Sequence, residues 1–177
     1  MMHHVTLLIG GNQGDRHQYI NHTTELVRQR IGSVVALSGI YETEPWGNFD
    51  IQNSEIGILN FLNCALLVET EMTPEQVIHE ALAIEASQGR VRTEDAPVVD
   101  AGERVYHSRP MDIDIIFYDN LVMDTPDLQI PHPRMHLRRF VLEPLAEIMP
   151  QYRHPILDKT VEELLHEIIQ KETLASL

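Results

Sequence analysis

The segment that most constrains the fold is an apolar run headed by two aspartates, from Met111 to Tyr118. Its β-branched and aromatic residues predict a strand, in which alternate side chains point to the same face. Asp112 and Asp114 are therefore expected to share one face. The opposite face would carry Met111, Ile113, Ile115 and Phe117. At a rise of about 3.3 Å per residue, the two carboxylates would leave the main chain roughly 6.6 Å apart.

Two carboxylates at this spacing can converge on one divalent cation, or hold two cations about 4 Å apart. Carboxylates beside an apolar strand are unfavourable unless they are neutralised or solvated. Oxygen ligands suit hard cations, and Mg²⁺ keeps water and shares phosphate oxygens, so the pair indicates phosphate chemistry. A solvated strand edge explains the same two residues, and the pair alone does not separate these interpretations.

The 177 residues, 43% of them hydrophobic, predict a single domain spanning residues 1–177. A formal net charge of −14 predicts no nucleic-acid partner. No segment approaches the roughly 20 apolar residues of a membrane span, and the apolar run from Val5 to Ile9 is too short for a signal peptide. The single cysteine, Cys64, excludes an internal disulfide. We therefore expect a cytoplasmic monomer without a membrane partner.

Apolar periodicity and turn residues predict alternating strands and helices. Strands are expected at residues 5–9, 34–43, 59–69 and 111–118, with a short one near 121–123. Helices are expected at 16–31, 74–87, 135–147 and 161–171, with capping boxes at Thr73 and Thr160. Residues 10–15 would form a turn, and the aperiodic segment at about 93–108 would form a flexible lid loop. This order predicts an α+β fold around one mainly antiparallel sheet.

Other side chains suit an anionic, ring-shaped ligand. Arginines cluster near the aspartates in sequence or on the flanking helices: Arg90, Arg92, Arg109, Arg138 and Arg139. Facing a metal pair, they would favour a triphosphate, although surface arginines that offset an acidic protein explain them equally well. His132, between two prolines, could donate to a phosphate oxygen or simply lie in solvent. Phe61 and Asn63 alternate, so ring and amide could recognise a flat heterocycle, or Phe61 could be a core residue.

Several other nucleotide and metal motifs are absent from the sequence. There is no G-x-x-x-x-G-K-[ST] phosphate loop and no G-x-G-x-x-G fingerprint. No cluster of cysteine and histidine has the spacing of a zinc site. The Gly10-Gly11-Asn12 segment is a weak signal by itself.

Together these segments resemble one family, the 6-hydroxymethyl-7,8-dihydropterin pyrophosphokinases. The matching segments follow the family's order: Ile9–Arg16, Tyr41–Gly47, Phe61–Asn63, Glu85–Arg92, Ser108–Ile115, Pro131–His132, Arg138, Phe140 and Glu143–Leu145. The resemblance implies a ferredoxin-like α+β sandwich, with a mainly antiparallel sheet flanked by helices. It also implies a transferase of folate biosynthesis that moves pyrophosphate from ATP to the pterin hydroxymethyl group and releases AMP.

The resemblance further assigns roles to individual residues. Two Mg²⁺ ions would bind Asp112 and Asp114, which with Arg92 and Arg109 would form the catalytic set. The pterin would contact Thr43, Trp46, Phe61, Asn63 and Phe140. The co-substrate ATP would contact Glu85, Arg90, Arg92, Arg109, Ile115, His132 and Arg138.

Two rival functions fit parts of the sequence. A metal-dependent glycosyltransferase can use an Asp-x-Asp pair, but it would need an open parallel sheet for its nucleotide sugar. A non-catalytic ferredoxin-like binding module would fit the order of elements, but it leaves the aspartates and arginines unexplained. Pterin binding that depends on a nucleotide would separate both rivals from the kinase.

Overall fold

A computed structural model describes residues 1–12, 14–43, 48–49, 60–88, 105–106 and 111–176 of the chain. Its strands are β1 (His3–Gly11), β2 (Ser33–Leu37), β3 (Tyr41–Thr43), β4 (Asn48–Phe49), β5 (Phe61–Thr70), β6 (Val105–Tyr106), β7 (Asp112–Tyr118), β8 (Met123–Asp124) and β9 (Gln129–Ile130). Its helices are α1 (Arg16–Arg30), α2 (Pro74–Ser87), the 3-10 helix η2 (Met135–Leu137), α3 (Arg139–Ile148) and α4 (Val161–Ala175).

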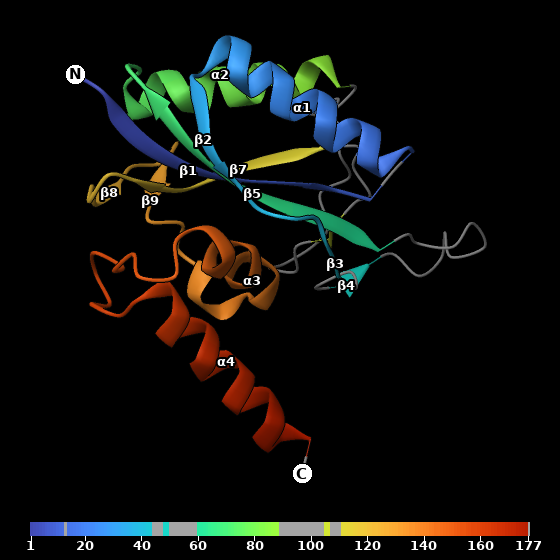
Figure 1. Ribbon diagram of the computed structural model, residues 1–177, viewed down its shortest axis with the longest axis vertical. Coiled ribbons are helices and arrows are strands. Elements are labelled where there is room, and N and C mark those ends of the chain that lie inside the picture. Colours follow the sequence, from blue (N-terminus) through green and yellow to red (C-terminus); the bar gives the residue numbers. More distant parts are fainter. Residues whose placement is uncertain (13, 44–47, 50–59, 89–104, 107–110, 177) are drawn as a thin grey trace.

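The main sheet has the strand order β2-β5-β1-β7. Strand β3 also pairs with β5, at residues 61–63, whereas β2 pairs with residues 66–69 of β5. All of these pairs are antiparallel. Helices α1 and α2 cover one face of the sheet, whereas α3 and α4 lie on the other (Figure 1). The predicted α+β sandwich is confirmed, and the antiparallel main sheet is unlike the open parallel sheet that the glycosyltransferase interpretation requires.

Each face of the sheet has its own apolar core. Toward α1 and α2, strand residues such as Leu7 and Leu66 join Val27 and Ile84 of the helices. Toward α3 and α4, the core combines strand and helix residues in a second cluster: Leu8, Ala65, Ile116, Phe117, Met135, Val141, Leu142, Leu145, Val161, Leu164 and Ile168. Both faces of the central strands are therefore buried, which explains their nearly continuous apolar sequences.

One detail of the aspartate strand differs from strict alternation. The ladder between β1 and β7 shifts register between Thr6 and Leu7, which leaves Ile116 as an extra residue. Such a β-bulge reverses the faces of the residues beyond it. Phe117 consequently lies in the core beside α3 and α4, so the prediction that it shares a face with Ile113 is wrong.

The predicted strand at 34–43 is two strands, because Ser38 interrupts it. The Ser38 hydroxyl accepts a hydrogen bond from the Ala65 amide at 2.9 Å, and the Ser38 amide donates to the Ala65 carbonyl.

The predicted turn at 10–15 begins later than expected. Strand β1 continues to Gly11, which is paired with Leu62 of β5.

The helix boundaries follow their capping residues. Thr73 and Gln76 form the predicted capping box of α2, and the Thr160 hydroxyl accepts from the Glu163 amide at the start of α4. The predicted helix at 135–147 is instead η2 followed by α3, because Arg138 is extended, with φ −121° and ψ 104°. Among the described residues, no helix combines the length and apolar character needed to cross a membrane.

Some predictions lie outside the described residues. They concern Trp46, Arg90, Arg92, Arg109 and the lid loop at about 93–108, apart from β6. Within the described part, β6 pairs in parallel with β4.

Candidate active site

The candidate site is organised by one row of residues that crosses the main sheet. Gly10 of β1 is paired with Asn63 of β5 on one side and with Asp112 of β7 on the other. Asn63 is paired in turn with Tyr41 of β3. Paired residues project to the same face, and neighbouring strands lie about 4.8 Å apart. The main chains of Asn63 and Asp112 are therefore about 10 Å apart across Gly10.

The two aspartates lie on the face of the sheet that α3 covers. Asp112 is paired with Gly10 and Asp114 with Leu8, whose side chain belongs to the core beside α3. The bulge at Ile116 comes after both residues, so their alternation is intact, and the predicted shared face is confirmed. Both side chains are half-buried, which leaves part of each accessible to a ligand.

Asn63, Phe61 and Thr43 lie together at the other end of this row. Phe61 is paired with Thr43, and Phe61 and Asn63 alternate along β5, so ring and amide share a face as predicted. Asn63 is only 4% exposed. Its Nδ2 donates a hydrogen bond of 2.9 Å to the Thr43 hydroxyl. The amide is therefore held in a fixed place at the rim of the sheet.

Helix α3 closes this end of the face. Phe140 lies in its first turn and packs against the adjoining core, and the Arg138 guanidinium carbon lies 5.6 Å from the centre of the Phe140 ring. A cation this close to an aromatic face is attracted to it. Arg138 and Phe140 therefore place a positive charge and an aromatic ring side by side at the start of α3.

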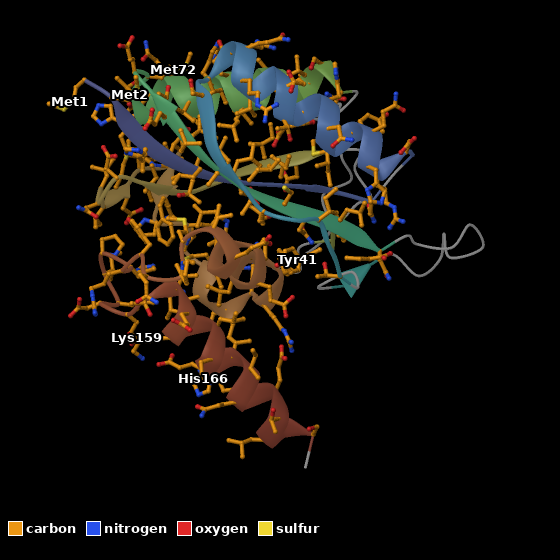
Figure 2. The ribbon with its side chains drawn as sticks, viewed as in Figure 1. Met1, Met2, Tyr41, Met72, Lys159 and His166 are labelled. Atoms are coloured by element: carbon orange, nitrogen blue, oxygen red, sulfur yellow. The ribbon has the colours of Figure 1, made fainter. Side chains whose placement is uncertain are left out.

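The carboxylate of Glu147 ties α3 to β3. It accepts hydrogen bonds from the Tyr41 hydroxyl at 2.7 Å and from the Gly39 amide at 3.0 Å. Figure 2 labels Tyr41 where the sheet approaches α3. The hydrogen bond to Glu147, together with burial, raises the pKa of Tyr41 to about 12. The phenol therefore stays protonated at neutral pH and keeps donating to this link.

Three of the residues predicted for ATP, namely Glu85, Ile115 and His132, belong to β7 or contact its outer edge. Oε1 of Glu85, in α2, accepts a hydrogen bond of 2.8 Å from the Ile113 amide, and Glu85 is 2% exposed. Further along the same strand, the His132 amide donates to the Ile116 carbonyl at 3.0 Å. The side chain of Ile115 is only 3% exposed in the core toward α1 and α2. Its main chain points to the same edge as that of Ile113, because alternate residues of a strand do so.

Strand β7 thus separates two groups of predicted residues and carries the aspartates between them. Phe61, Asn63 and Thr43 belong to the sheet, and Phe140 packs against the core on the same side. Glu85 and His132 contact the edge of β7. The described residues contain no group of three or more histidine, cysteine, aspartate or glutamate side chains that could hold a metal.

Gly10 is the residue whose importance the sequence did not reveal. It was expected in a turn, yet it lies inside the sheet between Asn63 and Asp112. A Cβ added there would lie 2.6 Å from Oδ1 of Asn63 and 2.9 Å from the Leu62 carbonyl oxygen. The apolar residues that run into Gly10 could have indicated a strand that continues through the glycines.

Comparison with known proteins decides the family. The family model of 7,8-dihydro-6-hydroxymethylpterin-pyrophosphokinase matches residues 6–150. The chain belongs to this pyrophosphokinase family. A relative of Porphyromonas gingivalis, a 2-amino-4-hydroxy-6-hydroxymethyldihydropteridine pyrophosphokinase, is 36% identical over 152 residues, which cover 85% of this chain and 93% of the relative. A Bacillus subtilis protein of the same name is 34% identical over 146 residues, or 82% of this chain and 77% of its own.

Solved structures agree with this pyrophosphokinase fold. The HPPK-DHPS protein of Plasmodium falciparum with pteroate matches with a TM-score of 0.72 and 16% identity, over 97% of this chain. The chain spans 45% of that longer chain. It is also 36% identical to a folic acid synthesis protein of Dictyostelium discoideum, of which it covers 22%. The predicted family and fold are confirmed, and so is the family activity of pyrophosphate transfer from ATP to hydroxymethyldihydropterin.

Proposed function

We propose that this chain performs the pyrophosphokinase reaction on the face of the sheet where Asn63, Gly10 and Asp112 form one row. The main support for this proposal is the row itself, because it brings Asn63, which would bind the pterin ring, onto the same face as Asp112 and Asp114. The pterin would bind at the Asn63 end, ATP would bind along the edge of β7, and Asp112 and Asp114 would lie between the two.

The acidic pair suits two Mg²⁺ ions. Both carboxylates are half-buried and lie on one face, and two side chains supply only part of an octahedral shell. Water and phosphate oxygens would fill the other positions, as Mg²⁺ prefers. Bound Mg²⁺ would supply positive charge to the phosphates and hold them for displacement.

The pterin site would use rings and an amide. Phe61 and Phe140 come from opposite walls, the sheet and α3, and can hold a flat ring between them. Asn63 would recognise the polar edge of that ring, because an amide both donates and accepts hydrogen bonds. Thr43 and Trp46 would complete the pocket.

ATP would lie against positive groups and the open edge of β7. The proposed contacts are Glu85, Arg90, Arg92, Arg109, Ile115, His132 and Arg138. Ile115 would act through its main chain, since its side chain is buried in the core. Glu85 is also buried, and its hydrogen bond to Ile113 fixes the strand that a nucleotide would meet.

The reaction would then be a displacement at the β-phosphorus. The hydroxymethyl oxygen forms a bond to this phosphorus, and the bond from the β-phosphorus to the bridging oxygen of the α-phosphate breaks. AMP leaves with that electron pair, and the hydroxyl proton passes to water, because a loose transition state needs little help from a base. The arginines Arg92 and Arg109 would stabilise charge on the transferred group, and alignment of the two substrates supplies much of the acceleration.

Replacement of Asp114 tests this proposal. We expect Asp114→Ala to lower pyrophosphoryl transfer by at least about a hundredfold in saturating Mg²⁺, because a charge-stabilising group at the transferred phosphate is lost. The fold should survive, since Asp114 is half-buried and lies outside both apolar cores. AMP formation measured by chromatography gives the rate, and circular dichroism reports the fold.

Asp127→Ala is the matched control, because Asp127 is an exposed aspartate outside the proposed site. It should turn over like the original protein. Near-normal turnover in Asp114→Ala would remove the aspartate pair from the mechanism. Fluorescence titration of the unmodified protein with a pterin and a non-hydrolysable ATP analogue tests the substrates, and an absence of pterin binding would reject the kinase.

A further inference from the structure

We propose that Thr43 and Gly10 are positioning residues that fix the Asn63 amide and thereby decide which ring edge the site accepts. This inference rests on the proposed function, because it concerns the same pterin site. Its two supports are a hydrogen bond at one end of the amide and, at the other, a close approach to a residue without a side chain.

The hydrogen bond holds the nitrogen end of the amide. Nδ2 of Asn63 donates to the Thr43 hydroxyl at 2.9 Å, from a side chain that is 4% exposed. Thr43 is the last residue of β3 and is paired with Phe61 of β5. A buried amide has few alternative partners, so this hydroxyl restrains the position and plane of the amide, with Nδ2 facing Thr43.

The oxygen end of the amide packs closely against Gly10. Oδ1 of Asn63 is 2.6 Å from the point that a Cβ on Gly10 would occupy, and the Leu62 carbonyl oxygen is 2.9 Å from it. Real Cβ atoms do not tolerate such contacts, so any other residue at position 10 would displace the amide or the strand. Gly10 leaves room for the carbonyl oxygen on the side of the row that leads to Asp112.

Together these contacts orient the recognition group. The acceptor of the amide lies on the β1 side and its donor lies on the β3 side. A ring edge that donates hydrogen bonds, such as the 2-amino edge of a pterin, fits toward β1. A ring with an oxygen in place of that amino group would set two acceptors against each other.

The first test compares Thr43→Val with Thr43→Ser. Valine keeps the size of threonine without the hydroxyl, and serine keeps the hydroxyl. The probes are 6-hydroxymethyl-7,8-dihydropterin and 6-hydroxymethyl-7,8-dihydrolumazine, in which oxygen replaces the 2-amino group. We expect Thr43→Val to raise the KM for the pterin about tenfold and to reduce pterin-over-lumazine discrimination by a similar factor, with a smaller effect on the KM for ATP. Thr43→Ser should retain most of the discrimination.

The second test adds a methyl group at Gly10. Gly10→Ala should weaken pterin binding, measured by fluorescence, by at least about tenfold while the protein remains folded by circular dichroism. Gly39→Ala is the control, because an added Cβ there meets Oε2 of Glu147 at an ordinary 3.6 Å. Pterin affinity should persist in this control.

Three outcomes would overturn the inference. Discrimination by Thr43→Val within twofold of the original protein would show that the hydroxyl does not set the amide. An equal loss of discrimination in Thr43→Ser, which keeps the hydroxyl, would assign the effect to the shape of the threonine side chain. Normal pterin affinity in Gly10→Ala would remove the second support. In each case an inactive Asp114→Ala leaves the proposed function standing, whereas an absence of pterin binding by the unmodified protein would end both proposals.

Discussion

At the scale of single residues, the buried carboxyl group of Glu85 shows how a helix can fix the strand that carries the two aspartates. It is 2% exposed and accepts a hydrogen bond from the Ile113 amide, between the two aspartates. This amide points away from β1, and among the described residues no strand of the main sheet pairs with this edge of β7. A polar group in such a place is retained only when its contacts offset its desolvation.

Glu85→Ala should therefore lower the free energy of unfolding by about 2–4 kcal/mol, because the Ile113 amide loses its acceptor and a cavity forms. Glu85→Gln should cost less, since its amide oxygen can still accept. Urea unfolding followed by circular dichroism measures both variants. Equal losses in the two would show that the hydrogen bond to Ile113 does not carry the effect.

At the scale of elements, His154 holds the connection between α3 and α4. Its Nδ1 accepts hydrogen bonds of 3.1 Å from the amides of Ile156 and Leu157, and its ring packs edge-on to Phe117 at 5.8 Å. The side chain is 4% exposed. Burial, and then the neighbouring His136, lower the pKa of His154 below its usual value of about 6.5. The neutral ring is therefore the form that the fold requires.

This depressed pKa predicts acid sensitivity. The unfolded chain takes up a proton on His154 at higher pH than the folded chain does, so the contribution of His154 is complete above pH 6.5. It is lost as the pH falls through the folded pKa. The slope for one group approaches about 1.4 kcal/mol per pH unit. Urea unfolding between pH 7.5 and pH 5 measures it.

His154→Asn is the matched variant, because the Asn oxygen can accept from the same amides and does not titrate. Its free energy of unfolding should fall less steeply over this range. A slope as steep as that of the original protein would assign the acid sensitivity to other groups.

At the scale of the whole molecule, the excess of acidic residues opposes the compact state. The chain has 27 acidic and 13 basic side chains, for a formal net charge of −14. Local pairs, such as Arg139 with Glu172, offset only part of this repulsion. Binding of an anionic nucleotide to such an acidic protein would depend on the few arginines near the candidate site.

The monomeric state, the cytoplasmic location and the lid loop stay predictions.

Salt should therefore stabilise the protein. Raising NaCl from about 10 mM to about 100 mM shortens the Debye length from about 30 Å to about 10 Å and screens the repulsion between distant carboxylates. We expect the thermal unfolding midpoint to rise by a few degrees. Choline chloride at equal ionic strength should act similarly, and a midpoint that stays level or falls would mean that local ion pairs outweigh the net charge.

The sequence alone determined features that depend on residues a few positions apart. Alternation placed Asp112 with Asp114 and Phe61 with Asn63 on shared faces, and the spacing of Thr73 and Gln76 gave the capping box of α2. These patterns can be predicted from sequence because strand and helix periods, and capping hydrogen bonds, involve residues only a few positions apart. The family motifs added the activity, which comparison confirmed.

Only the tertiary structure decided which distant residues meet. Pairing of β1 with both β5 and β7 placed Gly10, an expected turn residue, between Asn63 and Asp112 at the centre of the candidate site. The bulge at Ile116 moved Phe117 to the opposite core, and the Ile113 amide found its acceptor in α2. Register, bulges and edge contacts depend on strands that are remote in sequence, so no local pattern of residues encodes them.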